Sequence, residues 1–290
     1  MKLGIGTAQF GMKYGLTNNS EKTGFVEAKK IMEMAQKHGI PIIDTAKAYG
    51  NSEEILGKLF HTSCPFNLIT KIPKLTTQTN VSKALKHYFF DSLNKLNQSS
   101  IYGLLLHNSE DLLSVNGDEI YDDLLELKEK GYIKKVGISV YDQEDIERII
   151  EKYNIDMVQL PLNIFDQRFK KTGYLKFLRK LGIEIHARSI FLQGLLIEDP
   201  KKLPSFFDPI KNDLIFFQNE TKKLNISPVE AALNFVLNID EVDYGIIGVN
   251  NSAQLEEILV SLNKNLNDFD FSHFAIQNEQ YIKPMNWKID

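Results

Sequence analysis

The chain has 290 residues, of which 43% are hydrophobic and 25% charged, and its net charge is −4. These values are ordinary for a globular protein, and at this length folding buries roughly 75% of the surface that the unfolded chain exposes. The negative charge argues against a dedicated nucleic-acid-binding protein, which usually has a basic face. We therefore expect no nucleic-acid partner.

The cysteine content and the hydropathy of the chain indicate in which cellular compartment to expect the protein. Cys64 is the only cysteine, so no disulfide can form within the chain, which fits a reducing environment. The N-terminus shows no charged segment followed by a long apolar one, so no secretory signal is visible. No apolar run approaches the roughly 18 residues that cross a bilayer. We expect a cytoplasmic protein with no membrane partner.

Short apolar runs alternate with segments of helical period along the chain. The runs, each a predicted strand, are 3–7, 40–44, 68–71, 101–107, 136–139, 157–161, 183–188 and 244–248. Between them apolar residues recur at spacings of three and four, which is typical of amphipathic helices. The helical segments are 25–38, 81–96, 120–130, 146–153, 174–181, 208–224 and 227–238.

This alternation predicts parallel strands joined by right-handed crossovers. Eight such units match a (β/α)8 TIM barrel, whose usual size is about 250 residues. A doubly wound open sheet is the alternative, but it usually has a Gly-x-Gly-x-x-Gly turn after the first strand. The segment Gly6-Thr-Ala-Gln-Phe-Gly11 lacks that spacing, and no linker divides the chain. We predict one domain over 1–290.

Two segments depart from the repeat. The stretch 189–208 follows the seventh predicted strand and contains prolines but no clear period. Loops of this length are often functional. The segment 263–290 is polar with scattered aromatic residues, and we expect it to pack on the barrel.

Three predicted strands end in a residue that can take part in proton transfer, namely Asp44, Lys71 and His107, and Tyr49 follows Asp44 closely. In a barrel the carboxyl ends of strands face the active site. A lysine ammonium roughly 4 Å from a phenol would stabilise the phenolate by about 4 kcal/mol at a dielectric constant of about 20. We therefore expect Lys71 to lower the pKa of Tyr49.

Together these residues could protonate a carbonyl oxygen. Asp44 would keep Lys71 charged, and His107 would orient the oxygen. The set has no hydride source, so it implies a cofactor. Each residue also has a simpler interpretation as a loop cap, a solvated charge, a helix entry or a packed aromatic, but their coincidence on consecutive strands favours an active site.

The spelling Asp44-Thr-Ala-x-Ala-Tyr49-Gly-Asn-Ser-Glu-x-x-x-Gly57 resembles the aldo-keto reductases. Similarity continues at Thr70-Lys71, Leu104-Leu-Leu-His107, Gly131-x-Ile133-Lys-x-Val-Gly137-Ile-Ser139, Val158-Gln159 and Ser189-x-x-x-Gln193-Gly194-Leu-Leu. The resemblance covers nearly the whole chain. It implies a tetrad of Asp44, Tyr49, Lys71 and His107, with Tyr49 as the general acid.

The same resemblance implies NADP(H) as the cofactor. Ser139 and Gln159 match positions that hold the nicotinamide carboxamide. Val140 stands where an asparagine is usual, and Arg188 where many members have an aromatic residue that stacks on the nicotinamide.

The segment Gly248-Val-Asn-Asn251-Ser-Ala-Gln254-Leu-x-Glu257 resembles the loop and helix start that hold the adenosine phosphate. The basic residues that many members use for the 2′-phosphate are missing, so NAD(H) stays open. The expected cofactor-binding residues are Gly6, Thr7, Asp44, Ser139, Gln159, Arg188, Ser189, Gly194, Gly248, Asn251, Gln254 and Glu257. The expected substrate contacts are Phe10, Met12, Tyr49, His107 and Phe191.

The remaining histidines show no Cys/His spacing of a zinc site, and we predict no metal. The sequence thus predicts an NADP(H)-dependent reductase of an aldehyde or ketone, which could be derived from a sugar. Two alternatives stay open. One is a nucleotide-sensing regulatory subunit of the same fold with little turnover, and the other is a lyase or isomerase that uses Lys71 as a Schiff base. The oligomeric state is not predicted.

Overall fold

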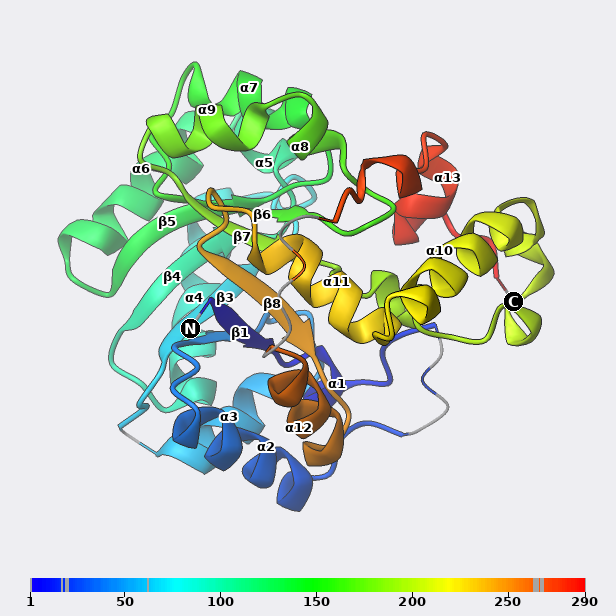
Figure 1. Cartoon of the computed structure of the whole chain (residues 1–290). Helices are drawn as coiled ribbons and strands as arrows, with labels where there is room; N and C mark the ends of the chain where they lie inside the picture. The colour runs from blue at the N-terminus through cyan, green and yellow to red at the C-terminus, as the bar shows by residue number, and fades with distance from the viewer. Residues whose placement is uncertain are drawn as a thin grey trace.

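The computed structural model describes residues 2–16, 18, 21–61, 63–262, 266 and 269–289. Parallel strands form a closed barrel in chain order, with the last strand paired to the first (Figure 1). They are β1 (Leu3–Gly6), β2 (Ile42–Asp44), β3 (Asn67–Ile72), β4 (Ile101–Leu106), β5 (Ile133–Ser139), β6 (Met157–Pro161), β7 (Glu184–Arg188) and β8 (Tyr244–Gly248). The predicted (β/α)8 barrel is confirmed, and every predicted strand is present with small differences at its ends.

Helices surround the strands in Figure 1. The longer ones are α2 (Phe25–Lys37), α3 (Ser52–Phe60), α4 (Val81–Leu96), α6 (Gly117–Glu129), α7 (Gln143–Ile150), α9 (Tyr174–Lys180), α10 (Lys211–Lys223), α11 (Pro228–Leu237) and α12 (Ser252–Ser261). Short turns of helix are α1 (Ala8–Gly11), α5 (Glu110–Leu113), α8 (Arg168–Lys171) and α13 (Glu279–Ile282). All the predicted helical segments are found. Helix α3 is present in the structure but was not predicted.

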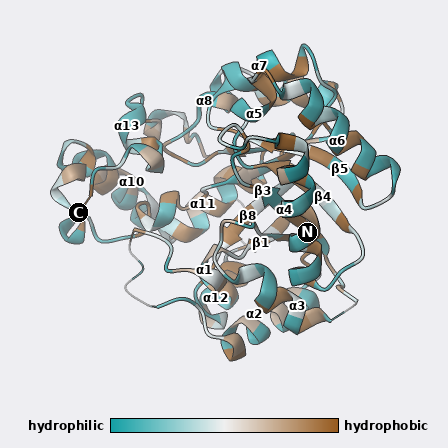
Figure 2. Cartoon of the chain, turned by 180° about the vertical axis from the view of Figure 1, so that it is seen from behind, coloured by the Kyte–Doolittle hydropathy of each residue, from teal (hydrophilic) through white to brown (hydrophobic). Residues whose placement is uncertain are grey.

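The apolar residues occupy two regions. A large core lies between the strands and the surrounding helices, and a small one fills the barrel interior. Figure 2 shows the hydrophobic residues concentrated on the strands and the hydrophilic ones on the outer helix faces. The interior is tightly filled, because a Cβ added to Gly103 would lie 3.0 Å from the sulfur of Met157. The barrel is therefore a solid support for its loops.

The stretch 189–208 is not structureless. It contains the 3₁₀ helices η1 (Leu192–Gly194) and η2 (Pro200–Lys202) and the start of η3 (Ser205–Ile210). These turns leave the end of β7 and lead into α10. Their first part, between Ser189 and Ile197, lines the mouth of the barrel.

Part of the segment 263–290 lies outside the described residues; its described part includes η4 (Ser272–Phe274) and η5 (Pro284–Asn286). The amide of Ile276 donates to the carbonyl oxygen of Phe165 at 2.9 Å. Nζ of Lys283 donates to Oδ2 of Asp142 at 2.8 Å. Because Asp142 and Phe165 belong to loops that follow strands, these contacts hold the C-terminal segment at the carboxyl end of the barrel. No helix in the described ranges has the length and apolar character needed to span a membrane.

Candidate active site

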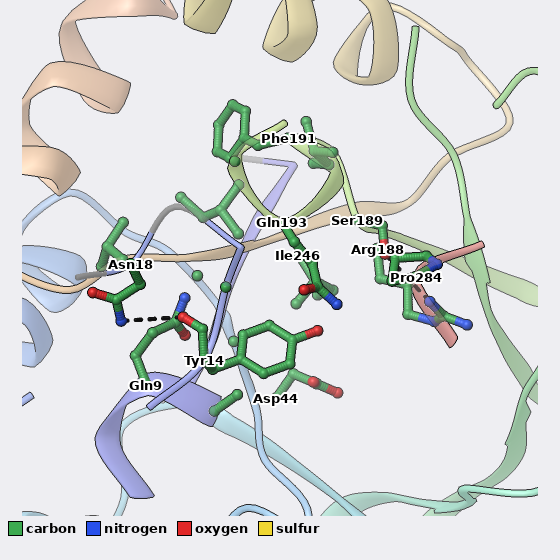
Figure 3. Close-up of a pocket in the computed structure, with 18 of the residues that line it drawn as sticks. Gln9, Tyr14, Asn18, Asp44, Arg188, Ser189, Phe191, Gln193, Ile246 and Pro284 are labelled. Carbon is green, nitrogen blue, oxygen red and sulfur yellow. Dashed lines mark hydrogen bonds between the residues drawn. The ribbon is translucent and has the colours of Figure 1, made fainter. Parts of the chain in front are cut away.

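A cavity of about 570 Å³ opens at the carboxyl ends of the strands. This is the face on which (β/α)8 enzymes carry their active sites, and Figure 3 shows part of the wall. The predicted site residues that line it are Gly6, Met12, Asp44, Tyr49, His107, Ser139, Gln159, Arg188, Ser189, Phe191, Gly194, Gly248, Gln254 and Glu257.

Four predicted residues meet at the floor of this cavity. Nζ of Lys71 lies 2.6 Å from Oδ2 of Asp44 and 3.5 Å from the hydroxyl oxygen of Tyr49. The rings of Tyr49 and His107 meet edge to face with their centres 5.8 Å apart. Strands β2, β3 and β4 are consecutive in the barrel, which is why residues far apart in sequence converge here.

Lys71 lies beneath the floor and does not line the cavity. Its side chain is fully buried, and its ammonium also donates to the carbonyl oxygen of Thr45 at 3.0 Å. The other carboxylate oxygen of Asp44 accepts a hydrogen bond from Nε2 of Gln159 at 2.8 Å. Burial lowers the pKa of Lys71, and the carboxylate of Asp44 opposes this change. The ion pair is closed off from water and fixed by hydrogen bonds on both sides.

The pKa of Tyr49 moves against the sequence prediction. Burial, and next the negative charge of Asp44, raise the pKa of Tyr49 above its ordinary value, while the charge of Arg188 lowers it. The expected net lowering of the Tyr49 pKa is wrong because burial and the negative charge of Asp44 outweigh the effect of the nearby ammonium, which is itself paired with Asp44. The phenol of Tyr49 is therefore protonated and uncharged throughout the physiological pH range.

His107 is a neutral donor as well. Burial lowers the pKa of His107 to about 4, and the charge of Lys71 adds to this effect. Near pH 7 the imidazole is uncharged, so one ring nitrogen carries a hydrogen and the other accepts. The cavity floor thus presents two uncharged donors above a buried ion pair.

Two glycines set the position of Tyr49. A Cβ on Gly11 would lie 1.7 Å from the carbonyl oxygen of Tyr49, and one on Gly50 would lie 2.3 Å from the carbonyl oxygen of Gly11. Gly50 also has a φ of +55°, in the left-handed region that favours glycine. The backbone of α1 therefore packs directly on the turn that carries Tyr49.

Comparisons with known proteins agree with this geometry. The model of the aldo/keto reductase family matches residues 2–279. The chain belongs to the aldo/keto reductase family. An uncharacterized oxidoreductase of Bacillus subtilis, YqkF, is 30% identical over 207 residues, which cover 68% of this chain and 66% of the relative. An NADPH-dependent alpha-keto amide reductase of Saccharomyces cerevisiae is 27% identical over 214 residues, or 71% of this chain and 67% of that protein.

Solved structures show the same fold. An aldo-keto reductase from Bacillus halodurans in its holo form matches with a TM-score of 0.75 and 22% identity, covering 94% of this chain and 90% of that one. A glycerol dehydrogenase from Gluconobacter oxydans matches with a TM-score of 0.72 and 21% identity, covering 100% and 94% of the two chains.

The two departures of this aldo/keto reductase from the family pattern contact each other. Nη2 of Arg188 donates to the carbonyl oxygen of Val140 at 2.9 Å, and Nη1 donates to the hydroxyl of Ser189 at 3.2 Å. The guanidinium carbon lies 4.0 Å from the ring centre of Tyr141. The side chain of Val140 is itself buried in the core. Val140 therefore acts through its backbone carbonyl group, which anchors the side chain of Arg188 in the cavity wall.

The far end of the cavity lies at the start of α12. Asn251 is exposed and caps this helix, accepting from the amide of Gln254 at 2.9 Å. The carboxylate of Glu27 accepts from the amide and the hydroxyl of Ser252 at 2.7 and 2.6 Å. These hydrogen bonds lower the pKa of Glu27 to about 2. A carboxylate of the protein therefore already occupies part of the helix N-terminus.

Four predicted site residues do not line the cavity. Lys71 and Thr7 are buried beneath it, where the hydroxyl of Thr7 donates to the carbonyl oxygen of Asp44 at 3.1 Å, and Asn251 lies on the surface. Phe10 is fully buried in the large core. Its position does not support the expected contact with the substrate, because the side chain is packed in the core and does not line the cavity.

The cavity also contains residues that the sequence analysis missed, namely Gln9, Tyr14, Asn18, Tyr141, Pro284 and Met285. In Figure 3 the ring of Tyr14 lies beside Asp44, and the amide of Asn18 donates to the carbonyl oxygen of Tyr14 at 3.1 Å. Tyr141 comes two residues after Ser139, so the strand-end rule extended by two positions would have found it. No group of three or more His, Cys, Asp or Glu side chains in the described part of the chain is arranged to hold a metal.

Replacing Gly11 by alanine should displace the turn that carries Tyr49. We expect a loss of roughly 1–3 kcal/mol in unfolding free energy, as for other overpacked sites, and a fall in kcat. Urea unfolding and steady-state kinetics measure both. Gly24→Ala is the matched control, because a Cβ there meets nothing within 4 Å. Wild-type stability and kcat in Gly11→Ala would contradict this account of Tyr49.

Removing Lys71 should leave the carboxylate of Asp44 buried without a cation. We expect Lys71→Met to lower the unfolding free energy by about 3–5 kcal/mol, and Asp44→Asn combined with Lys71→Met to recover most of it. The exposed pair of Lys130 with Glu126 offers a control, since Lys130→Met should change stability little. A double variant as unstable as Lys71→Met would show that charge pairing is not the cause.

Proposed function

We propose that this chain is an NADP(H)-dependent carbonyl reductase that converts an aldehyde or ketone to an alcohol, with Tyr49 as the proton donor. The observation that carries the proposal is the assembly of Tyr49, His107 and the Lys71–Asp44 pair at the floor of a large cavity. Such a site supplies a proton and stabilises negative charge on a carbonyl oxygen.

The residues that would hold a nicotinamide nucleotide fit that role. Ser139 lines the cavity, and its hydroxyl has no hydrogen-bond partner among the described residues. Gly248 exposes its backbone to the cavity, and a Cβ there would strike the side-chain amide of Gln9. Gln254 and Glu257 line the same end. A reduced nicotinamide bound here would supply the hydride that the protein itself lacks.

The protein's own groups would handle the proton. The substrate's carbonyl oxygen would accept hydrogen bonds from the hydroxyl of Tyr49 and the neutral ring of His107. As negative charge grows on that oxygen, the proton of Tyr49 moves to it, and the ammonium of Lys71, 3.5 Å away, stabilises the phenolate that is left. Because Lys71 is enclosed, the charge is provided without a shell of water.

The Schiff-base alternative fits the geometry poorly. A Schiff base needs the nitrogen of Lys71 to reach a substrate carbon. That nitrogen is fully buried and bonded to Asp44 and Thr45. Freeing the nitrogen of Lys71 for such a reaction would break its buried ion pair with Asp44.

NADP(H) is proposed from the family resemblance and from the NADPH dependence in the name of the yeast relative. NAD(H) is the second candidate, because one observation favours it. The carboxylate of Glu27 from α2, which accepts from Ser252 at the start of α12, and that of Glu257 in the cavity wall disfavour an extra phosphate near α12. Calorimetric titration with NADPH and NADH decides between them.

Tyr49→Phe tests the proton donor. We expect kcat for carbonyl reduction to fall by roughly 10²- to 10⁴-fold, the usual contribution of general acid catalysis, while the nucleotide Kd stays within error of wild type. Tyr132→Phe, outside the cavity, is the control. A near wild-type kcat in Tyr49→Phe would contradict the assignment of Tyr49 as the proton donor. A wild-type protein that binds nucleotide but turns over no member of a carbonyl panel would point to the regulatory alternative.

The pH profile follows from the two pKa shifts. His107 titrates near pH 4, and the pKa of Tyr49 is raised, so both donors keep their protons across neutral pH. We expect kcat/KM for reduction to stay flat from about pH 5 to about pH 9 and to fall only as Tyr49 ionises. An inflection between pH 6 and 7 that disappears in His107→Gln would contradict the neutral imidazole.

A further inference from the structure

Arg188 is a cation in the cavity wall without an anionic partner. Among the described residues it forms no ion pair, and no other lysine or arginine side chain lines the cavity. Arg168 behaves differently, because it is bonded to Asp166 at 2.9 Å and to Asp142 at 2.8 Å. Arg188 is half-buried, and a partly buried guanidinium usually has such partners, so its lack of an anionic partner calls for an explanation.

The acidic residues of the cavity do not neutralise the positive charge of Arg188. Asp44 is engaged by Lys71 and by Gln159, which occupy both carboxylate oxygens. Glu257 belongs to α12 at the opposite end. The substrate end of the cavity therefore carries an uncompensated positive charge.

The guanidinium is fixed but still has hydrogens to offer. It has five N–H groups, and its protein bonds go to the carbonyl oxygen of Val140 and the hydroxyl of Ser189. The ring of Tyr141, 4.0 Å away, holds its plane. A planar fork of this kind suits a carboxylate bound through both oxygens.

Arg188 is anchored away from the end of the cavity, at β8 and α12, where the nucleotide phosphates are expected. The anchors Val140 and Tyr141 follow β5, which pairs with β4, the strand that leads to His107. Strand β8 and helix α12 lie on the other side of β7. Its charge makes a smaller contribution that lowers the pKa of both Tyr49 and His107, in keeping with its place on the side of the cavity where those residues lie. In Figure 3 Arg188 and Pro284 lie on one side of the view and Gln9 and Asn18 on the other.

We propose, building on the carbonyl reduction proposed above, that Arg188 binds a carboxylate group of the substrate. The preferred substrates are then aldehydes or ketones that carry a carboxylate separated from the carbonyl by a short apolar spacer. Apolar contact with that spacer would come from Met285 and from Pro284, which the pairing of Lys283 with Asp142 holds at the mouth.

Two matched substrate pairs test this assignment. Each pair joins a carboxylate to its uncharged amide of nearly the same shape, 4-oxobutanoate with 4-oxobutanamide and 4-formylbenzoate with 4-formylbenzamide. We expect wild type to prefer the carboxylate of at least one pair in kcat/KM by about 10- to 100-fold, the range for a hydrogen-bonded charge. Arg188→Gln should reduce that ratio to near one, because the carboxylate loses its hydrogen-bonded cation whereas the amide has no charge to be matched.

Further measurements separate the causes. Arg188→Lys should keep part of the preference, because it retains the charge without the fork, and the exposed Arg179→Gln should keep all of it. The Kd values for NADPH and NADH should be the same in wild type and Arg188→Gln. A preference that survives in Arg188→Gln overturns the proposal, and so does a loss of nucleotide affinity as large as the loss of substrate selectivity.

Failure of the proposed function would look different. If wild type reduces neither member of either pair, carbonyl reduction is in doubt, but binding of succinate and of benzoate to the protein still tests Arg188. Calorimetry should then detect carboxylate binding that Arg188→Gln weakens by about 10-fold or more. Equal binding to both proteins, with unchanged thermal stability, would refute a carboxylate site at Arg188.

Discussion

The buried ion pair between Lys71 and Asp44 is the interaction on which the site depends. Enclosing two charges is costly, and it is tolerated only where geometry and further hydrogen bonds replace the lost water. Here Lys71 also bonds Thr45, and Asp44 also bonds Gln159, which comes from the opposite side of the barrel. The pair therefore ties β2, β3 and β6 together through the barrel mouth. A ligand bound above the pair therefore experiences an electrostatic field of fixed direction, because both side chains are held in place.

Burial and this pair together keep the residues above it uncharged. Burial raises the pKa of Tyr49, and the negative charge of Asp44 adds to that change. Burial lowers the pKa of His107, and the positive charge of Lys71 adds to that change. The charge left in the cavity then lies at its two ends, with Arg188 near the reacting groups and Glu257 near α12. A cavity with opposite ends of opposite sign can orient an elongated ligand before any short contact forms.

The fold could be predicted because short apolar runs alternate with segments of helical period along the chain. The convergence of Asp44, Lys71 and His107 could be predicted because each ends an apolar run, and a parallel barrel brings the carboxyl ends of its strands to one face. Burial could not be predicted from the sequence. Spacing alone suggested that Lys71 would control the pKa of Tyr49, whereas in the structure burial and the charge of Asp44 have the largest effects on that pKa. Val140 and Arg188 looked like unrelated departures because they are 48 positions apart, and only the fold shows that they touch.

The turn after β7 links the two ends of the cavity, and its backbone is strained. Ser189 and Gln193 both have positive φ values, 61° and 54°, which cost non-glycine residues of the order of 1–3 kcal/mol each. Long-range bonds offset this cost: Asn163 donates to the carbonyl oxygen of Ser189 at 3.1 Å, and the amide of Leu16 donates to that of Gln193 at 3.0 Å. Because the strained turn is held on both sides, it cannot relax without breaking one of these bonds. Ser189, which belongs to this turn, also accepts a hydrogen bond from Arg188 at 3.2 Å, so the fixed backbone sets one of the two hydrogen bonds that orient the guanidinium.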